Sequence, residues 1–185
     1  MGQLDALASF PSRVGGGLRQ AWRHRVGRIR LSGERVEAWG RELRAVHLRL
    51  REALQIAEES VRAGTAPESL SSDLTLFCRG FCVALAGHHS SEDTSLFPLV
   101  VEQHPELAPV VAKLMQDHSL LAHLITDFEH ALGRAAEAES LLRHLDGIGA
   151  VMESHFRYEE RQLVEVLDAI SADDLDRTTL FGPIA

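Results

Sequence analysis

Two segments of this chain carry the same short pattern, a histidine followed four residues later by a glutamate and then by a second acid. The histidines are His88 and His155, and the glutamates are Glu92 and Glu159. On an α-helix, residues i and i+4 are separated by about 400° of rotation, so their side chains lie on nearly the same face, one turn apart. The pattern therefore predicts two helices that each present an imidazole beside a carboxylate.

A lone histidine precedes each pattern at a similar distance. His47 lies 41 residues before His88, and His118 lies 37 residues before His155. The chain thus repeats one arrangement in its two halves. If a bundle of four helices brings these side chains together, they form a metal site of four imidazoles and two carboxylates. The predicted ligands are His47, His88, Glu92, His118, His155 and Glu159.

Apolar residues recur every three or four positions in four long stretches, which is the period of an amphipathic helix. We expect four helices, over about residues 34–62, 69–96, 105–133 and 135–170. The segment 64–67 separates the first two, Pro98 ends or kinks the second, and Gly133 ends the third. Four helices of similar length with short connections predict an all-α fold, an up-down-up-down antiparallel four-helix bundle.

Composition divides the chain into an arginine-rich N-terminal arm (1–33), the bundle (34–170) and a C-terminal tail (171–185) whose apolar residues could cover one end of the core. The arm has six arginines and one acid, although the net charge of the whole chain is −8. Such an arm can bind an anionic surface, either nucleic acid or lipid. We favour an arm that packs on the acidic bundle or stays solvated, because it has few aromatic residues and no nucleic-acid-binding motif.

The two cysteines, Cys78 and Cys82, are four residues apart on an apolar stretch that we expect to be helical. One turn apart on a single helix is poor geometry for a disulfide, so we expect buried, reduced thiols. Reduced thiols favour a cytoplasmic protein. The sequence has no run of about 18 apolar residues and no basic start of a signal peptide, so neither a membrane span nor a secretory signal is expected.

Two carboxylates on an apolar helix face need a compensating charge, because burying them unpaired would cost many kcal/mol or force them neutral. No lysine or arginine shares the inward turns of Glu92 and Glu159, and Arg157 should point elsewhere. A pair of divalent or trivalent metal ions would neutralise the carboxylates and use the imidazole lone pairs. Mixed nitrogen and oxygen ligands suit iron or manganese, with zinc as a further option.

Over about residues 36–170 the chain resembles the hemerythrin-like (HHE cation-binding) domain family. The matching elements are Val46-His47-x-x-Leu50-Arg51, the run from His88 to Leu96-Phe97-Pro98, Asp117-His118, and His155-Phe156-x-x-Glu159-Glu160. The resemblance implies a non-haem di-iron centre in a four-helix bundle, with two oxo- or hydroxo-bridged iron ions, and favours iron over manganese or zinc. It also implies that Glu92 and Glu159 bridge the irons and that each iron has two terminal histidines.

Oxygen-carrying hemerythrins are similar but hold five histidines, two of them four residues apart on the third helix. In this chain the residue four after His118 is Ala122, and His123 lies about 140° around the helix from His118. The carboxylate of the fourth helix is Glu159, four residues after its histidine, whereas the oxygen carriers have an aspartate five residues after it. Both departures count against simple oxygen carriage. They favour open metal positions that react with O2, peroxide or nitric oxide, or a site that senses iron.

Some other polar residues have weaker claims on the site. His123 is the reserve fifth ligand, whereas His89, about 100° from His88, is expected to face a neighbouring helix or solvent. Tyr158 could lie near the metals, but a position at the core boundary with its hydroxyl in water is the more ordinary expectation. Four acids are expected to be solvated or to orient the ligands: Asp93, Asp117, Glu153 and Glu160.

Three functions fit these observations. The first is a di-iron oxidoreductase that consumes peroxide or nitric oxide, or reacts with O2, and its partners are small molecules. The second is a non-catalytic module that senses or stores oxygen or iron. The third, a structural bundle without metal, is the least favoured because it leaves the two buried carboxylates uncompensated. The sequence does not decide between enzyme and sensor, and it does not indicate an oligomeric state.

Overall fold

The computed structural model of this chain describes residues 32–63, 72–170 and 176–185. The chain divides into two units, Met1–Leu31 and Ser32–Ala185, and only the second contains described residues. The predicted arm, residues 1–33, therefore lies almost wholly outside the described residues. So do the connection between the first two helices and the start of the C-terminal tail, residues 171–175.

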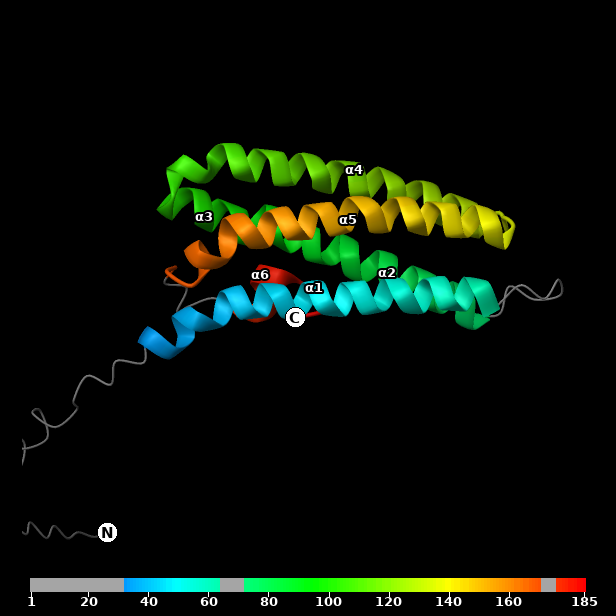
Figure 1. Cartoon of the computed structure of the whole chain (residues 1–185), viewed down its shortest axis with the longest axis horizontal. Coiled ribbons are helices and arrows are strands. Elements are labelled where there is room, and N and C mark those ends of the chain that lie inside the picture. The colour runs from blue at the N-terminus through cyan, green and yellow to red at the C-terminus, as the bar shows by residue number, and fades with distance from the viewer. Residues whose placement is uncertain (1–31, 64–71, 171–175) are drawn as a thin grey trace, which may run out of the picture. The chain divides into compact units, whose positions relative to one another are not determined.

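The described residues form helices and no strands, which confirms the all-α prediction (Figure 1). The α-helices are α1 (Ser32–Ala63), α2 (Ser72–Ser91), α3 (Phe97–Gln103), α4 (Ala108–Gly133), α5 (Ala138–Leu167) and α6 (Arg177–Phe181). Two short helices of other types are η1, a π-helix (Glu92–Leu96), and η2, a 3₁₀-helix (Pro105–Leu107). The four long helices lie where the apolar period predicts them.

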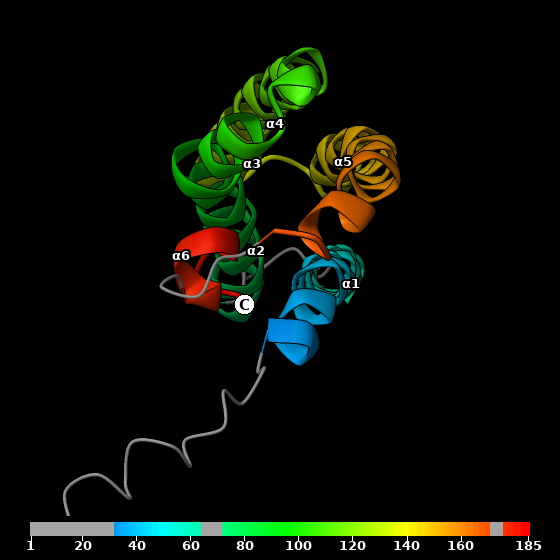
Figure 2. The ribbon, with the colours of Figure 1, turned by 90° about the vertical axis from the view of Figure 1, so that its left-hand side faces the viewer.

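The long helices lie side by side around one core (Figure 2). Helix α1 packs against α2 and α5, and α4 packs against α5 and α2. Seen end-on, α1 and α5 lie on one side of the core, and α2 and α4 lie on the other. Their buried leucine, valine and phenylalanine side chains form a continuous apolar cluster. The apolar faces of all four long helices therefore meet in one core.

The second helix of the sequence changes type at the predicted metal-binding motif. It leaves the α-helical pattern at Ser91, forms a π-helical turn over Glu92–Leu96, and resumes as α3 at Phe97. Pro98 then lies in the first turn of α3, where a missing backbone N–H is tolerated. The predicted break near Pro98 is therefore a change of helix type a few residues earlier. Such π-helical turns are frequent at functional sites.

The C-terminal residues return to the core after α5. Helix α6 contacts α2, η1 and α1, and its Leu180 and Phe181 are fully buried. The Phe181 ring lies 5.9 Å from the Trp39 ring on α1. The described part of the tail thus covers the core beside the histidine motif of α2.

Cys78 and Cys82 are buried and form no disulfide, as predicted. None of the described helices is long and apolar enough to cross a membrane.

Candidate metal centre

The six predicted ligands meet in the core, and four long helices contribute to the meeting point. They are His47 on α1, His88 on α2, Glu92 on η1, His118 on α4, and His155 and Glu159 on α5. All six side chains are buried. Residues as far apart as 47 and 159 therefore lie together because each sits on the inward face of its own helix.

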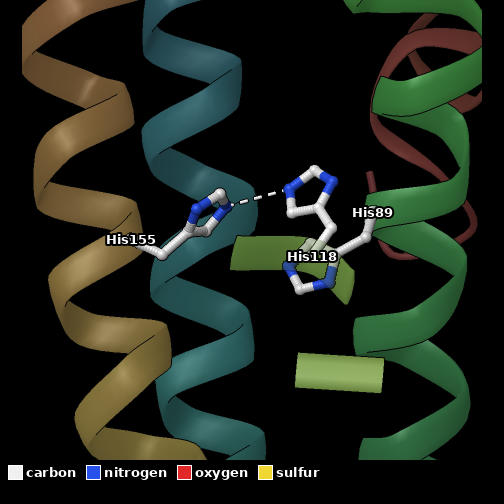
Figure 3. A group of neighbouring side chains, drawn as sticks. All are labelled: His89, His118 and His155. Atoms are coloured by element: carbon white, nitrogen blue, oxygen red, sulfur yellow. Dashed lines mark hydrogen bonds between the residues drawn. The ribbon is translucent and has the colours of Figure 1, made fainter. Parts of the chain in front are cut away.

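The potential ligand atoms fall into two neighbouring groups. His47, His88, Glu92 and Glu159 each offer an atom within 4.8 Å of the others. The second group consists of three imidazoles, His118 and His155 together with His89 (Figure 3). In this second group, Nε2 of His118 lies 3.0 Å from Nε2 of His155.

The two carboxylates connect the groups. Glu92 lies 3.2 Å from Nε2 of His88 through one oxygen and 3.5 Å from Nε2 of His118 through the other. Oε2 of Glu159 lies 3.3 Å from Nε2 of His47 and 3.6 Å from Nε2 of His155. Each carboxylate is therefore within reach of a histidine from both groups.

The imidazoles that meet the carboxylates turn Nε2 inward and Nδ1 outward. Nδ1–H of His47 donates to Oε1 of Glu160 at 2.8 Å, and Nδ1–H of His118 donates to Oδ1 of Asp93 at 2.8 Å. These two acids directly follow Glu159 and Glu92 in the sequence, and they orient histidines on other helices. Such acceptors fix the ring orientation and leave the Nε2 lone pair for a metal.

The other two rings have different acceptors. Nδ1 of His88 lies 3.0 Å from the backbone carbonyl of Phe181 on α6. Nδ1 of His155 lies 3.8 Å from Oδ2 of Asp117, which is longer than a direct hydrogen bond. Of the acids expected to support the ligands, Asp93 and Glu160 do so directly, whereas Glu153 pairs with Arg51 and Arg157.

The centre gathers an unusual number of buried polar atoms that have no hydrogen-bond partner. Among the described residues, these atoms include Nε2 of His47, His88 and His89 and both carboxylate oxygens of Glu92 and Glu159. Nearly all buried polar groups in proteins are satisfied, so this many orphaned acceptors in one place require an explanation. A cation bound by imidazole nitrogens and carboxylate oxygens would satisfy them, and transition metals favour this mixed set of ligands.

Burial keeps most of the imidazoles neutral. Burial, reinforced by the nearby charge of His47, lowers the pKa of His88 to about 3. Burial also lowers the pKa of His155 to about 4, and it lowers that of His89 well below the usual value. Neutral imidazoles have a free lone pair, the form in which histidine binds metals.

The two carboxylates differ in protonation when no metal is bound. Burial and the neighbouring charge of Glu159 raise the pKa of Glu92 well above its usual value. Burial alone would raise that of Glu159 too, but the close approach and charge of His47, whose Nε2 lies 3.3 Å from Oε2 of Glu159, outweigh it and lower the pKa to about 2. In return, Glu159 and Glu160 overcome the effect of burial and raise the pKa of His47. An imidazolium at His47 thus compensates one carboxylate and a proton neutralises the other.

Two residues weighed from the sequence lie away from the centre. His123 is exposed on α4 and its Nδ1 lies 2.6 Å from the carbonyl of Ser119, so the reserve fifth ligand does not join the cluster. Tyr158 is half-buried, with Nζ of Lys113 4.2 Å from its ring centroid and Arg161 close to the same ring. Its ring therefore lies among cationic side chains, in the ordinary boundary position.

His89 lies in the core beside the predicted ligands. The residue faces a neighbouring helix, as expected, but its contact there is His118, and its side chain is only 5% exposed. The available signal was the adjacent pair His88-His89 within an apolar stretch. The contribution of the Phe181 carbonyl had no comparable signal, because a backbone atom 93 positions away cannot be inferred from a side-chain pattern.

A cavity of about 550 Å³ lies between α2 and α4 next to the centre. Its lining includes His89, Asp93, His118 and the exposed Ala122. A small molecule in this cavity would touch two of the clustered imidazoles directly. The cavity therefore joins the molecular surface to one side of the centre.

Comparison with known proteins identifies the family of this chain. No curated protein and no solved structure matched the chain. Residues 41–167 match the family model of the hemerythrin HHE cation binding domain. This match covers more than half of the 185 residues and includes all six predicted ligands. The chain therefore belongs to the hemerythrin HHE cation-binding domain family.

Proposed function

We propose that this chain is a non-haem di-iron protein that binds or reacts with O2, peroxide or nitric oxide at a centre of four histidines and two glutamates. The observation that carries the proposal is the position of Glu92 and Glu159. Both are fully buried, both lack hydrogen-bond partners, and each lies within 3.6 Å of an imidazole from both groups. This position suits carboxylates that bridge two cations.

The frame that we propose for this centre is an up-down-up-down antiparallel four-helix bundle. Between α1 and α5, the Gly40 N–H donates to Asp168 at 3.1 Å, and Leu54 packs on Gly149. These contacts pair the start of α1 with the end of α5, so the two helices run in opposite directions. Helices α4 and α5 also run in opposite directions, because their contacts pair Lys113 with Tyr158, His118 with His155, and Phe128 with His144.

The side chains have separate roles in this proposal. His47 and His88 would hold one iron, His118 and His155 would hold the other, and Glu92 and Glu159 would contribute a carboxylate to both. A bound pair of irons supplies redox equivalents and positions that a small ligand can occupy. Asp93 and Glu160 hold two imidazoles in orientation, and the cavity between α2 and α4 admits the small molecule. Iron is favoured over manganese or zinc through the family resemblance, since the mixed ligands suit all three.

The alternative is a non-catalytic module that senses or stores oxygen or iron with the same ligands. Consumption of a substrate separates the two functions. Iron-loaded protein is mixed with peroxide, and separately with nitric oxide under reducing conditions, and loss of each molecule is followed. Catalytic loss of either one, well above that of the His118→Ala variant, supports the oxidoreductase. Stoichiometric binding without turnover supports the sensing or storage module.

A cytoplasmic location completes the proposal. Both cysteines are buried thiols, and burial raises the pKa of Cys78 to about 11 and that of Cys82 to about 12. Unpaired thiols of this kind are typical of reducing compartments. Fractionation of the native host cells, followed by detection of the protein in each fraction, tests this location.

A further inference from the structure

His89 is a buried histidine that the six-residue site does not use. Its side chain is 5% exposed, and its Nε2 is buried without a hydrogen-bond partner. A buried nitrogen that gives up water and gains no partner costs free energy. The unpartnered Nε2 therefore indicates that a group other than the protein itself binds there.

The position of His89 indicates what kind of group binds there. Its ring stacks on the ring of His118 with centroids 4.1 Å apart, and it meets the ring of His155 edge-on at 5.4 Å. One nitrogen from each of these three rings lies within 4.8 Å of the other two (Figure 3). The three side chains come from α2, α4 and α5 and converge on one point, which suits a single metal ion.

The cavity between α2 and α4 has a small side chain at position 122. Ala122 and His89 line the same cavity between α2 and α4. The alanine carries no side chain beyond Cβ, so α4 contributes one imidazole here, His118, and leaves room beside it. The ring of His89 enters from the facing helix and packs on His118.

We propose that His89 is a third histidine ligand of the metal bound by His118 and His155, an inference that rests on the proposed di-iron function. The chain then has five histidine ligands, with the fifth supplied by α2 and none from position 122. The two metals become unequal: His47 and His88 serve one, and His89, His118 and His155 serve the other.

The test compares His89→Ala with two matched variants. His123→Ala removes an exposed histidine from α4, and His155→Ala removes a predicted ligand from α5. Iron content per chain and the rate of iron loss to a chelator are measured for each, with circular dichroism to confirm the helical fold. We expect His89→Ala to lose one iron at least about 10-fold faster than wild type, as His155→Ala does, because removal even of groups behind the ligands typically costs 10–100-fold in metal affinity. Iron content and loss rate equal to those of wild type and His123→Ala would overturn the inference.

A second variant and a Mössbauer spectrum distinguish failure of the di-iron function from failure of the role proposed for His89. His89→Leu fills the buried position with an apolar side chain that cannot bind metal. It replaces His89→Ala if the alanine variant does not fold. A Mössbauer spectrum of wild-type protein loaded with ⁵⁷Fe should show two unequal iron environments in equal amounts, and one single environment would count against the third histidine. Wild-type protein without iron would contradict the di-iron function itself, whereas two irons that His89→Leu retains like wild type would contradict only the role of His89.

Discussion

Nδ1–H of His88 donates a hydrogen bond to the backbone carbonyl of Phe181, 3.0 Å away. Through this contact the C-terminal helix α6 orients a histidine of the candidate metal centre. The next residue, Gly182, has a φ of 83°, a conformation that glycine adopts without strain. A Cβ atom at this position would lie 2.8 Å from the carbonyl oxygen of Gly87 and 2.9 Å from Cα of His88. The contact therefore depends on a glycine that lets the tail approach α2 closely.

We expect Gly182→Ala to weaken metal binding although residue 182 contacts no metal. The added methyl group must push α6 away from α2, which removes the acceptor of His88 and introduces strain on the order of 1–3 kcal/mol. Loss of an orienting acceptor should raise the rate of iron release by about 10-fold or more. Gly147→Ala is the control, because a Cβ at Gly147 meets no atom within 4 Å. Iron release at the same rate from both variants would show that α6 does not support the centre.

Asp93→Ala is expected to reduce metal affinity by about 10–100-fold without removing a ligand, because Asp93 fixes the orientation of His118. The matched control is Asp127→Ala, which removes an exposed aspartate from α4. Competition with a chelator of known affinity, monitored by absorption, gives both values. If Asp93→Ala retains wild-type affinity, its hydrogen bond to His118 does not orient a ligand.

The sequence was sufficient for the part of the site that follows from helical geometry. His88 with Glu92 and His155 with Glu159 are one turn apart, so their common burial could be predicted from spacing alone. For the acids that follow Glu92 and Glu159, the sequence indicated that they could orient ligands, but not which histidine each one would orient. Which histidine Asp93 would orient depends on how α4 lies against the π-helical turn, and the sequence pattern does not contain that distance.

The position of His89 shows a second limit of the sequence. An angle of about 100° from His88 places a side chain outside a narrow inward stripe on an isolated helix. In the structure, α2 packs against both α1 and α4, so its buried face is wide enough for both histidines. The packing of whole helices therefore decides that His89 is buried.

Gly40→Ala should destabilise the fold at a distance from the centre. A Cβ at Gly40 would lie 2.6 Å from Oδ1 of Asp168 and 2.9 Å from Cγ1 of Val164, where α1 meets α5. The overlap should cost about 1–3 kcal/mol in the free energy of unfolding. Gly80→Ala is the control on α2: its Cβ meets no atom within 4 Å, and alanine there should stabilise the helix by up to about 1 kcal/mol. Urea unfolding of both variants measures the difference, and a Gly40→Ala protein as stable as Gly80→Ala would contradict the close packing of α1 on α5.

The metal-free protein should lose stability as the pH falls from 6.5 to 5. The folded-state pKa values of His88 and His155, about 3 and about 4, and that of His89 lie below the unfolded value of 6.5, so in this range only the unfolded chain takes up their protons. Glu92 acts in the opposite direction because its raised pKa lets the folded state hold a proton. His47, whose pKa is also raised, opposes the effect near pH 6.5 and is protonated in both states near pH 5. Near pH 5 the unfolded chain binds three protons at these histidines, and the folded state binds one at Glu92. The free energy of unfolding therefore falls by roughly 1.4 kcal/mol per pH unit for each excess proton. Urea unfolding at pH 6.5 and pH 5 checks the sign, and greater stability at pH 5 would contradict it.

The most direct test of the di-iron centre is the iron content of wild-type protein beside that of Glu159→Ala. The control is Glu165→Ala, which removes an exposed glutamate from the same helix. All three proteins are produced in iron-replete medium, and iron per chain is measured by mass spectrometry together with the absorption spectrum. We predict two irons per chain in wild type and in Glu165→Ala, and none in Glu159→Ala, because the loss of one bridge removes a ligand from both metals. Wild-type protein without iron, or equal iron in wild type and Glu159→Ala, would contradict the account.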